Sequence, residues 1–428
     1  MLPFVSSLLV SHLGSFPCLS ELTTGPGFLS STPTGDIIVA QFSGDPLEKD
    51  VVSVVEFSSI LNGVNVSNLN CKPITNAITW PNFVEFFSLG GGVSGVLAPG
   101  GFLVPPKTVG AVSVLDVNFS SAILKAPPAV LTKPKILPGD GWFYHKAFFF
   151  DVDGDGLKDV LAARCTKPLV ESPAGELIWL RNPSPTQPFS APNLPWSESV
   201  LANSSWSPDV SFTSPSSIRG DKDSQIFYTS FFTGGGLAFL QCSGCNGGGN
   251  NWATAELTLT ILDASIGPSF DVAVEDLNGD GTLDLLVTNH ADNATAPHIQ
   301  SGVFAYLAPP MGVSLTDSKA WTKHTLASGF EVREPGPNQA APGEATAFRL
   351  SGVPKPFILV SGDGEQRLTV LEPLSPGDPK DWGYARRALW DCKGTSGKQV
   401  VLEIGGAKYI AFPCYDSGEI HVFSVQQG

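Results

Sequence analysis

Short runs of strand-forming hydrophobic residues recur along the chain at regular intervals. Successive runs begin roughly 60 residues apart, a period typical of a repeated structural unit. The runs start at Val51, Ala111, Leu177, Leu237, Val303, Leu368 and Ile420. Seven such units fill the sequence from end to end.

Further strand-like segments surround each run. Two units have a pair of strands before the run, joined by an acidic turn, and several have a last strand after it that begins near a tryptophan. These tryptophans are Trp196, Trp321 and Trp382. Four antiparallel strands repeated seven times predict an all-β fold, a seven-bladed β-propeller, in which closure of the ring protects the sheet edges. We expect one domain over residues 21–428.

The two chain ends complicate this pattern. The last unit, "GEIHVFSVQQG", stops after its third strand, so we expect residues between about Phe16 and Ser31 to supply the fourth. The first twenty residues are apolar and end in small residues, which predicts a signal peptide over residues 1–20 and a secreted protein, although a basic start is missing. The alternative for this segment is a strand that closes the fold.

Composition supports the same class. Of 428 residues, 42% are hydrophobic and 15% charged, with 45 Gly and 36 Pro, which favours many short strands joined by turns. The net charge of -15 comes without a basic stripe, so we expect no nucleic-acid partner. Beyond the first twenty residues, no segment is long and apolar enough to predict a membrane span.

The chain has seven cysteines. If Cys18 leaves with the signal peptide, the remaining six can pair in an oxidising compartment. Cys242 and Cys245 form "CSGC", which favours a small disulfide loop over a zinc or redox site, because no second such motif occurs. Four glycosylation sequons, which predict a glycoprotein, begin at Asn65, Asn118, Asn203 and Asn293.

Two acidic turns share one spacing of oxygen-bearing side chains. Alternate residues direct oxygens toward one hard cation, a glycine at the sixth position permits the sharp turn, and the seventh carbonyl adds a ligand. The predicted Ca²⁺ ligands are Asp151, Asp153, Asp155, Leu157 and Asp159 in the first turn, and Asp276, Asn278, Asp280, Thr282 and Asp284 in the second. The alternative is a pair of turns without metal. The flanking strands and the missing glutamate at position 12 exclude an EF-hand.

With these turns, the chain resembles the FG-GAP or VCBS repeat of integrin-type propellers over essentially its whole length. The resemblance implies that the acidic turns lie on the lower face, where Ca²⁺ stabilises a hairpin. It also implies that the functional surface is the upper face, where loops from seven units converge around the axis.

The loops expected on the upper face contain aromatic, basic and acidic residues suited to stacking a flat ligand and moving a proton. The candidate catalytic residues are His290, His145, Arg164 and Tyr415, and the candidate ligand-binding residues are Trp142, Tyr144, Trp80, Asn289, Glu331, Arg333 and Asp363. Each has a structural alternative. Trp80 and Trp142 are typical blade-packing residues, His145 precedes a very apolar strand, and Asp363 occupies a tight turn.

No nucleophile elbow, P-loop or dinucleotide-binding motif occurs, so covalent hydrolase and nucleotide functions are disfavoured. A lectin gains avidity by repeating one pocket in many blades, but these upper loops differ from unit to unit. The asymmetry favours an enzyme with one cavity. A lectin and a sugar lyase or dehydratase remain alternatives, and no linker or second domain supports an adhesion module.

The apolar, acidic single propeller is also similar to the fungal hetero-Diels–Alderase family of tropolone–sesquiterpenoid pathways. That resemblance rests on fold, length and composition rather than on a motif. It implies an enzyme of secondary metabolite biosynthesis that dehydrates an aromatic or tropolone-like substrate to a quinone methide. A terpenoid alkene then adds to this intermediate, and no organic cofactor is needed.

Overall fold

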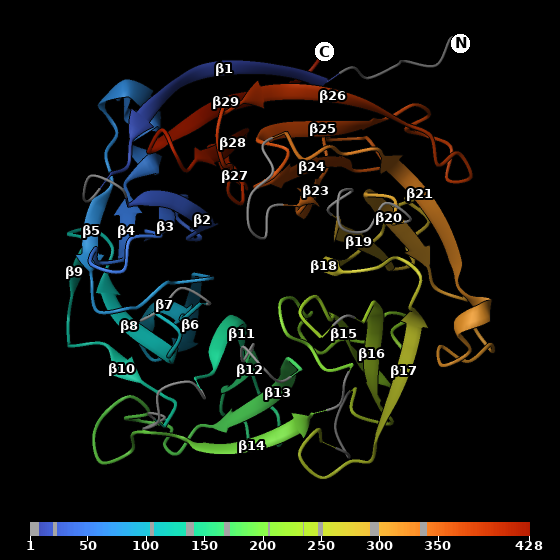
Figure 1. Ribbon diagram of the computed structural model, residues 1–428, viewed down its shortest axis with the longest axis horizontal. Helices are drawn as coiled ribbons and strands as arrows, with labels where there is room; N and C mark the ends of the chain where they lie inside the picture. The colour runs from blue at the N-terminus through green and yellow to red at the C-terminus, as the bar shows by residue number, and fades with distance from the viewer. Residues whose placement is uncertain are drawn as a thin grey trace.

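The computed structural model describes residues 8–19, 24–102, 107–133, 141–166, 172–203, 206–233, 235–246, 251–291, 299–333 and 340–428. Seven antiparallel sheets surround a central axis (Figure 1). The predicted all-β, seven-bladed propeller is therefore confirmed. Helical structure in the described ranges is limited to three short 3₁₀ turns: η1 (Phe57–Asn62), η2 (Val66–Asn68) and η3 (Ser318–Ala320).

The first three blades follow the predicted order of strands from the axis outward. Blade 1 contains β2 (Gly25–Ser31), β3 (Ile37–Phe42), β4 (Val51–Val55) and β5 (Lys72–Thr75). Blade 2 contains β6 (Glu85–Gly90), β7 (Val93–Pro99), β8 (Val112–Asn118) and β10 (Ala129–Val130), with β9 (Ile123–Leu124) paired to β8. Blade 3 contains β11 (Phe143–Phe150), β12 (Asp159–Thr166), β13 (Ala174–Arg181) and β14 (Ser197–Ala202).

The next three blades show two variations. In blade 4 the innermost strand is reduced to bridges from Phe212 and Ser216, beside β15 (Ser224–Thr229), β16 (Leu237–Cys242) and β17 (Leu257–Asp263). Blade 5 contains β18 (Ser269–Glu275), β19 (Asp284–Ala291), β20 (Gly302–Leu307) and β21 (Thr322–Ser328), and β22 (Ala341–Pro342) also pairs with β19. Blade 6 contains β23 (Glu344–Phe348), β24 (Phe357–Gly362), β25 (Arg367–Pro373) and β26 (Tyr384–Asp391).

Blade 7 closes the ring with strands from both ends of the chain. It contains β27 (Val400–Ile404), β28 (Ala407–Cys414) and β29 (Glu419–Gln427), and β1 (Leu8–Pro17) pairs antiparallel with β29 (Figure 1). The predicted donor range, Phe16–Ser31, is wrong, because most of the closing strand precedes Phe16 and β2 is the first strand of blade 1. The signal peptide over residues 1–20 stays a prediction.

The recurrent hydrophobic runs are the third strands of the blades. All five residues of β4 are buried, because neighbouring blades cover both faces of each sheet. Trp196 and Trp321 are likewise buried, and their indole nitrogens donate to the backbone carbonyls of Pro188 and Leu315, each at 2.9 Å. A strand buried on both faces needs continuous rather than alternating hydrophobic sequence, so these runs marked the repeat.

Three disulfides stabilise the ring: Cys18–Cys71, Cys242–Cys245 and Cys392–Cys414. The predicted loop between Cys242 and Cys245 is confirmed. The expectation that six cysteines pair without Cys18 is wrong, since Cys18 is bonded and the buried Cys165 stands outside the disulfides. Three disulfides are typical of a protein from an oxidising compartment. Among the described residues, no helix is long and apolar enough to cross a membrane.

Candidate functional site

A cavity of about 290 Å³ opens at the upper end of the axis, on the side away from the acidic turns. Its lining is mostly apolar, and every blade contributes to it. Among the lining residues are Phe28, Phe42, Trp80, Phe102, His145, Phe231, Phe232, Phe270, His290, Asp363 and Tyr415. The ring therefore builds one asymmetric site rather than seven equivalent ones.

Inner strands of three blades carry a β-bulge at equivalent positions near the cavity. The extra residues are Gly27 in β2, His145 in β11 and Phe270 in β18, and each lines the cavity. A bulge leaves one residue out of the ladder and redirects its side chain. The bulges thus place a histidine and a phenylalanine on the wall, and the residue after each bulge continues along the axis below.

Trp80 is the centre of an aromatic stack on one wall. Its ring stacks on Phe42 and Phe102, with centroid distances of 4.7 and 5.0 Å. Its backbone has φ +43°, a conformation that is costly for a non-glycine residue. The buried Asp50 stabilises it by accepting the Trp80 backbone N–H at 2.7 Å, and Lys107 pairs with Asp50 at 2.7 Å. This stack is fixed before any ligand binds.

Phe231 and Phe232 come from the loop after β15. Asp209, fully buried, accepts the backbone N–H groups of Phe231, Phe232 and Thr233 at 2.6, 2.7 and 2.8 Å. Burial raises the pKa of Asp209 to about 6, and these hydrogen bonds oppose that shift. One carboxylate therefore orders the loop that presents two aromatic rings to the cavity.

His290 and Asp363 lie side by side on the wall of the cavity. The Nε2 atom of His290 lies 3.3 Å from Oδ1 of Asp363, and its ring packs on Phe270 at 4.5 Å. The Nδ1 atom is buried and has no hydrogen-bond partner within the described residues. If Nε2–H donates to Asp363, Nδ1 carries a lone pair that can accept a proton.

His145 lies among the aromatic rings of Phe102, Phe143 and Phe232, at centroid distances of 5.8, 5.4 and 5.7 Å. Burial lowers its pKa to about 3, so the imidazole is neutral. Its Nε2 atom has no partner in the described part of the chain. A neutral, unsatisfied imidazole lining a cavity is suited to a hydrogen bond with a ligand. The lowered pKa makes the His145 imidazole unsuited to a role that requires its protonated, charged form.

A ring of polar residues from the inner strands, here called the axial ring, closes the floor of the cavity. Its members are Glu85, Lys146, Ser211, Asp271, Glu344 and Lys398. Lys146 Nζ donates to Ser211 Oγ at 2.9 Å, and Ser211 Oγ donates to Asp271 at 2.7 Å. Lys398 pairs with Glu344 at 2.5 Å. These contacts join neighbouring blades around the axis.

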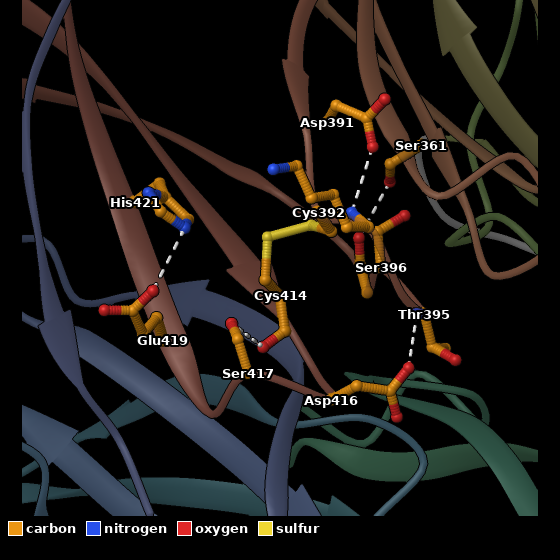
Figure 2. The surroundings of a disulfide bond; sticks show 12 residues. Ser361, Asp391, Cys392, Thr395, Ser396, Cys414, Asp416, Ser417, Glu419 and His421 are labelled. Carbon is orange, nitrogen blue, oxygen red and sulfur yellow. Dashed lines mark hydrogen bonds and ion pairs between the residues drawn. A yellow bond between two sulfur atoms is a disulfide. The ribbon is translucent and has the colours of Figure 1, made fainter.

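The disulfide Cys392–Cys414 fixes the rim of the cavity on the side of blade 7 (Figure 2). Cys414 ends β28 directly before Tyr415, and Cys392 begins the loop that carries Thr395 and Ser396. The Thr395 backbone N–H donates to Asp416 at 2.6 Å. Burial raises the pKa of Tyr415 to about 12. Its phenol therefore stays protonated at neutral pH and can act as a hydrogen-bond donor.

Three predicted site residues lie outside this cavity. Trp142, Tyr144 and Arg164 line a smaller pocket between blades 2 and 3. Arg164 pairs there with Glu176 at 2.5 Å and Glu198 at 2.9 Å, and its guanidinium lies 4.4 Å from the Trp142 ring centroid. Arg164 is therefore paired with two carboxylates of its own blade rather than facing the upper cavity.

Asn289, Glu331 and Arg333 also do not line the cavity. The buried Asn289 donates to the carbonyls of Ile266 and Gln300, both at 2.9 Å, and so fixes loops of blade 5. Glu331 is exposed. Arg333 pairs with Asp391 at 2.7 Å. The structure brings together five of the eleven candidates: Trp80, His145, His290, Asp363 and Tyr415.

The sequence analysis missed most of the aromatic wall. Phe42, Phe102, Phe231 and Phe270 were not among the candidates, although each stands at the upper end of a first or second strand or in the loop beside it. The sequence feature that could have identified these residues is their position at the upper strand ends. Several of these strand ends lie beside the axis, so a set of aromatic residues at them indicates an aromatic wall.

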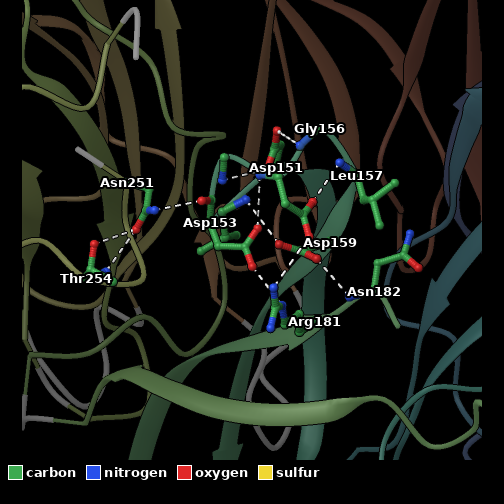
Figure 3. Close-up of polar contacts among 12 residues, drawn as sticks. Asp151, Asp153, Gly156, Leu157, Asp159, Arg181, Asn182, Asn251 and Thr254 are labelled. Atoms are coloured by element: carbon green, nitrogen blue, oxygen red, sulfur yellow. Dashed lines mark hydrogen bonds and ion pairs between the residues drawn. The ribbon is translucent and has the colours of Figure 1, made fainter. Parts of the chain in front are cut away.

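The first acidic turn joins β11 and β12 on the lower face. Figure 3 shows its polar contacts. Carboxylate oxygens of Asp151, Asp153 and Asp159 lie within 4.8 Å of one another. Asp159 is fully buried, and burial raises its pKa to about 6. Arg181 pairs with Asp153 at 2.7 Å, but half of its side chain is exposed, so it can move aside. This oxygen-only donor set fits a hard metal ion.

The second turn, between β18 and β19, repeats the backbone geometry of the first. Asp276 accepts the N–H groups of Gly279 and Gly281 at 2.8 and 3.0 Å, as Asp151 accepts those of Gly154 and Gly156 at the same distances. Asn278 replaces one carboxylate and donates to Asp280 at 2.8 Å. Its predicted ligand set, including Thr282 and Asp284, stays a prediction.

The sequons Asn65, Asn118 and Asn203 are exposed, as glycosylation requires. The fourth, Asn293, lies outside the described residues. Glycosylation stays a prediction.

No family model matches the chain, and no curated protein matches it. Similar solved structures include a catalytically inactive virginiamycin B lyase from Staphylococcus aureus with quinupristin, at 10% identity over 98% of this chain and 99% of that chain (TM-score 0.49). A puromycin-hydrolysing peptidase of Mycobacterium tuberculosis has 11% identity over 95% and 53% (TM-score 0.46). A PL25 ulvan lyase has 11% identity over 94% and 94% (TM-score 0.43). These low similarities carry no information about the activity of this chain.

Proposed function

We propose that the protein is an enzyme that acts on one apolar, ring-containing small molecule in the upper cavity. The observation that carries the proposal is the cavity itself. A preformed aromatic wall around Trp80 faces into the same space as His290 and Asp363. An apolar pocket with a few convergent polar groups is the usual form of a small-molecule site.

The chemistry we propose is a dehydration by general acid–base catalysis. The His290 imidazole accepts the proton of an acidic ring hydroxyl while Asp363 stabilises the imidazolium. The bond from carbon to a neighbouring hydroxyl group then breaks, and the imidazolium returns the proton to form water. The products are a quinone methide and one water, with no net proton change. In this proposal Tyr415, which lines the cavity, donates a hydrogen bond to a substrate oxygen.

The finer proposal is a hetero-Diels–Alder reaction of that quinone methide with a terpenoid alkene. A volume of about 290 Å³ is near the small end of ligand sites, so it suits one ring system. We infer that the alkene approaches from the open mouth, over the rings of Phe231 and Phe232. Stacking one partner on a fixed wall supplies the orientation that a cycloaddition needs.

Glycan binding is the alternative, as a lectin or a sugar lyase. Trp80 offers a ring on which a sugar can stack, but the site is single, so it lacks the repeated pockets on which lectin avidity depends. A ligand screen separates these functions. We would measure melting temperature and stoichiometry with hydroxymethyl phenols and tropolones beside a glycan array. Binding of glycans at several equivalents per chain would refute the single-site enzyme.

We further infer that the ion of the first acidic turn is Ca²⁺. Its ligands would be Asp151, Asp153 and Asp159, with Asp155 and the Leu157 carbonyl as predicted. Calcium prefers six to eight oxygen ligands and tolerates irregular geometry, as a turn of this kind offers. Bound there, the ion would neutralise clustered carboxylates. Its role would be structural, because the turn is on the face opposite the cavity.

A further inference from the structure

A second cavity, of about 580 Å³, lies below the axial ring on the side of the acidic turns. Inner strands of blades 1, 2, 6 and 7 form most of its walls. Leu29, Phe83 and Val400 give it apolar surface, and Lys398 lines both this lower cavity and the upper one. The axial ring therefore separates two cavities that share one axis.

One charged side chain of the lower cavity differs from the others because it has no ion-pair partner among the described residues. Lys398 pairs with Glu344, Arg349 with Glu275 at 3.5 Å, and Lys408 with Glu403. Glu85 also lines this cavity, but its side chain has no hydrogen bond or ion pair with any described residue. It is the one lining carboxyl group left without a partner within the described ranges.

The charges of the axial ring also leave one carboxyl group without a matching cation. Two ammonium groups, Lys146 and Lys398, face three carboxyl groups: Glu85, Asp271 and Glu344. Burial raises the pKa of Glu85 to about 7, and the two lysines only partly oppose that shift. Glu85 is partly buried, and a carboxylate held away from water without a partner is costly. A third cation beside Glu85 would balance the ring.

We propose that the lower cavity is a separate binding site for an organic ammonium ion, whose nitrogen pairs with Glu85. The apolar body of the ligand would contact Leu29, Phe83 and Val400. A bare divalent ion fits less well, because it needs six or more oxygens and finds one unpaired carboxyl group here. The net charge of -15 favours the approach of cations.

Isothermal titration calorimetry with benzylammonium at pH 8 tests the proposal, with benzyl alcohol as the uncharged counterpart. We expect one equivalent of the amine to bind and the alcohol not to bind. Glu85→Gln should weaken binding about tenfold or more. Glu403→Gln, which alters a paired carboxylate of the same cavity, should not. Absent binding, or equal affinity in Glu85→Gln, would overturn the proposal.

A second measurement needs no variant. Near pH 7, binding should release a fraction of a proton from Glu85, which appears as a dependence of the measured heat on the ionisation heat of the buffer. The groups facing Glu85 are Lys146 and Lys398, with Asp271 and Glu344 beyond them. Heat independent of buffer would contradict pairing with Glu85. Loss of binding in Asp363→Asn but not in Glu85→Gln would instead place the amine in the upper cavity.

Discussion

Oδ1 of Asp209 lies 2.6 Å from the backbone nitrogen of Phe231, and the same carboxylate accepts two further N–H groups of that loop. The buried Asp209 side chain thus holds the loop of Phe231 and Phe232 in one conformation. The relation resembles that of Asp50 with Trp80, whose backbone N–H the Asp50 carboxylate accepts. Two buried aspartates, each bonded to backbone N–H groups, fix much of the aromatic lining.

We expect Asp209→Ala to lower the free energy of unfolding by about 1–3 kcal/mol, because three backbone donors lose a buried acceptor. Ligand affinity in the upper cavity should fall as well, since Phe231 and Phe232 lose their fixed positions. Denaturant unfolding and ligand titration measure the two effects. Asp378→Ala, at an exposed turn, is the control and should change neither. Unaltered affinity in Asp209→Ala would show that this loop is outside the site.

His290→Phe separates catalysis from packing. The ring still packs on Phe231 and Phe270, so stability should be nearly unchanged, while both nitrogens are lost. Turnover of a dehydrated substrate should fall about 10²-fold or more, with little change in binding. Product formation followed by mass spectrometry, beside binding measured calorimetrically, gives both quantities. Normal turnover in this variant would exclude His290 as the base.

The fold was predictable because the hydrophobic pattern that indicates it is repeated in every blade. Each blade buries its third strand on both faces, so hydrophobic runs such as that from Val51 recur in every unit. The cluster of Asp151, Asp153 and Asp159 was also predictable, because the spacing of these carboxylates along a turn is a property of local chain geometry. Only the closing strand was misplaced, since pairing of β1 with β29 joins residues about 400 positions apart.

The site was only partly predictable, for a physical reason. Whether a residue at the upper end of a strand faces the axis or the next blade depends on β-bulges, as at His145 and Phe270. Successive side chains along a strand point to opposite faces, so a shift of one position moves a side chain from one face of the sheet to the other. Tyr144, one residue before a bulge, therefore lies in another pocket, while His145 lines the cavity.

Chelation should test the first acidic turn. Excess EDTA should lower the melting temperature of the purified protein, and Ca²⁺ should restore it, because the clustered carboxylates repel one another without an ion. Asp153→Ala should be less stable than the Ca²⁺-loaded protein and less sensitive to EDTA. Binding in the upper cavity should persist in that variant. A melting temperature indifferent to EDTA and Ca²⁺ would favour turns without metal.

The disulfide Cys18–Cys71 links the residue after the closing strand to blade 1. We expect Cys18→Ser, paired with Cys71→Ser, to lower the free energy of unfolding by about 2–4 kcal/mol. The disulfide Cys242–Cys245 closes a much shorter loop. Replacing both of its cysteines by serine should therefore lower the free energy of unfolding by less. Denaturant unfolding compares the two pairs. Sequencing the N-terminus of the expressed protein is the companion measurement, because cleavage near residue 20 would remove β1 and Cys18 together.

The seam between β1 and β29 should also respond to acid. His421 on β29 lies 3.3 Å from His12 on β1, and burial lowers its pKa to about 4, with Glu419 opposing the shift. The unfolded chain, with an ordinary histidine pKa near 6.5, binds more protons between these values. Stability therefore falls as pH falls from about 6.5 to about 4. His421→Phe, which keeps a ring against Trp390, should lose less stability over that window. An equal loss in both proteins would place the acid sensitivity elsewhere.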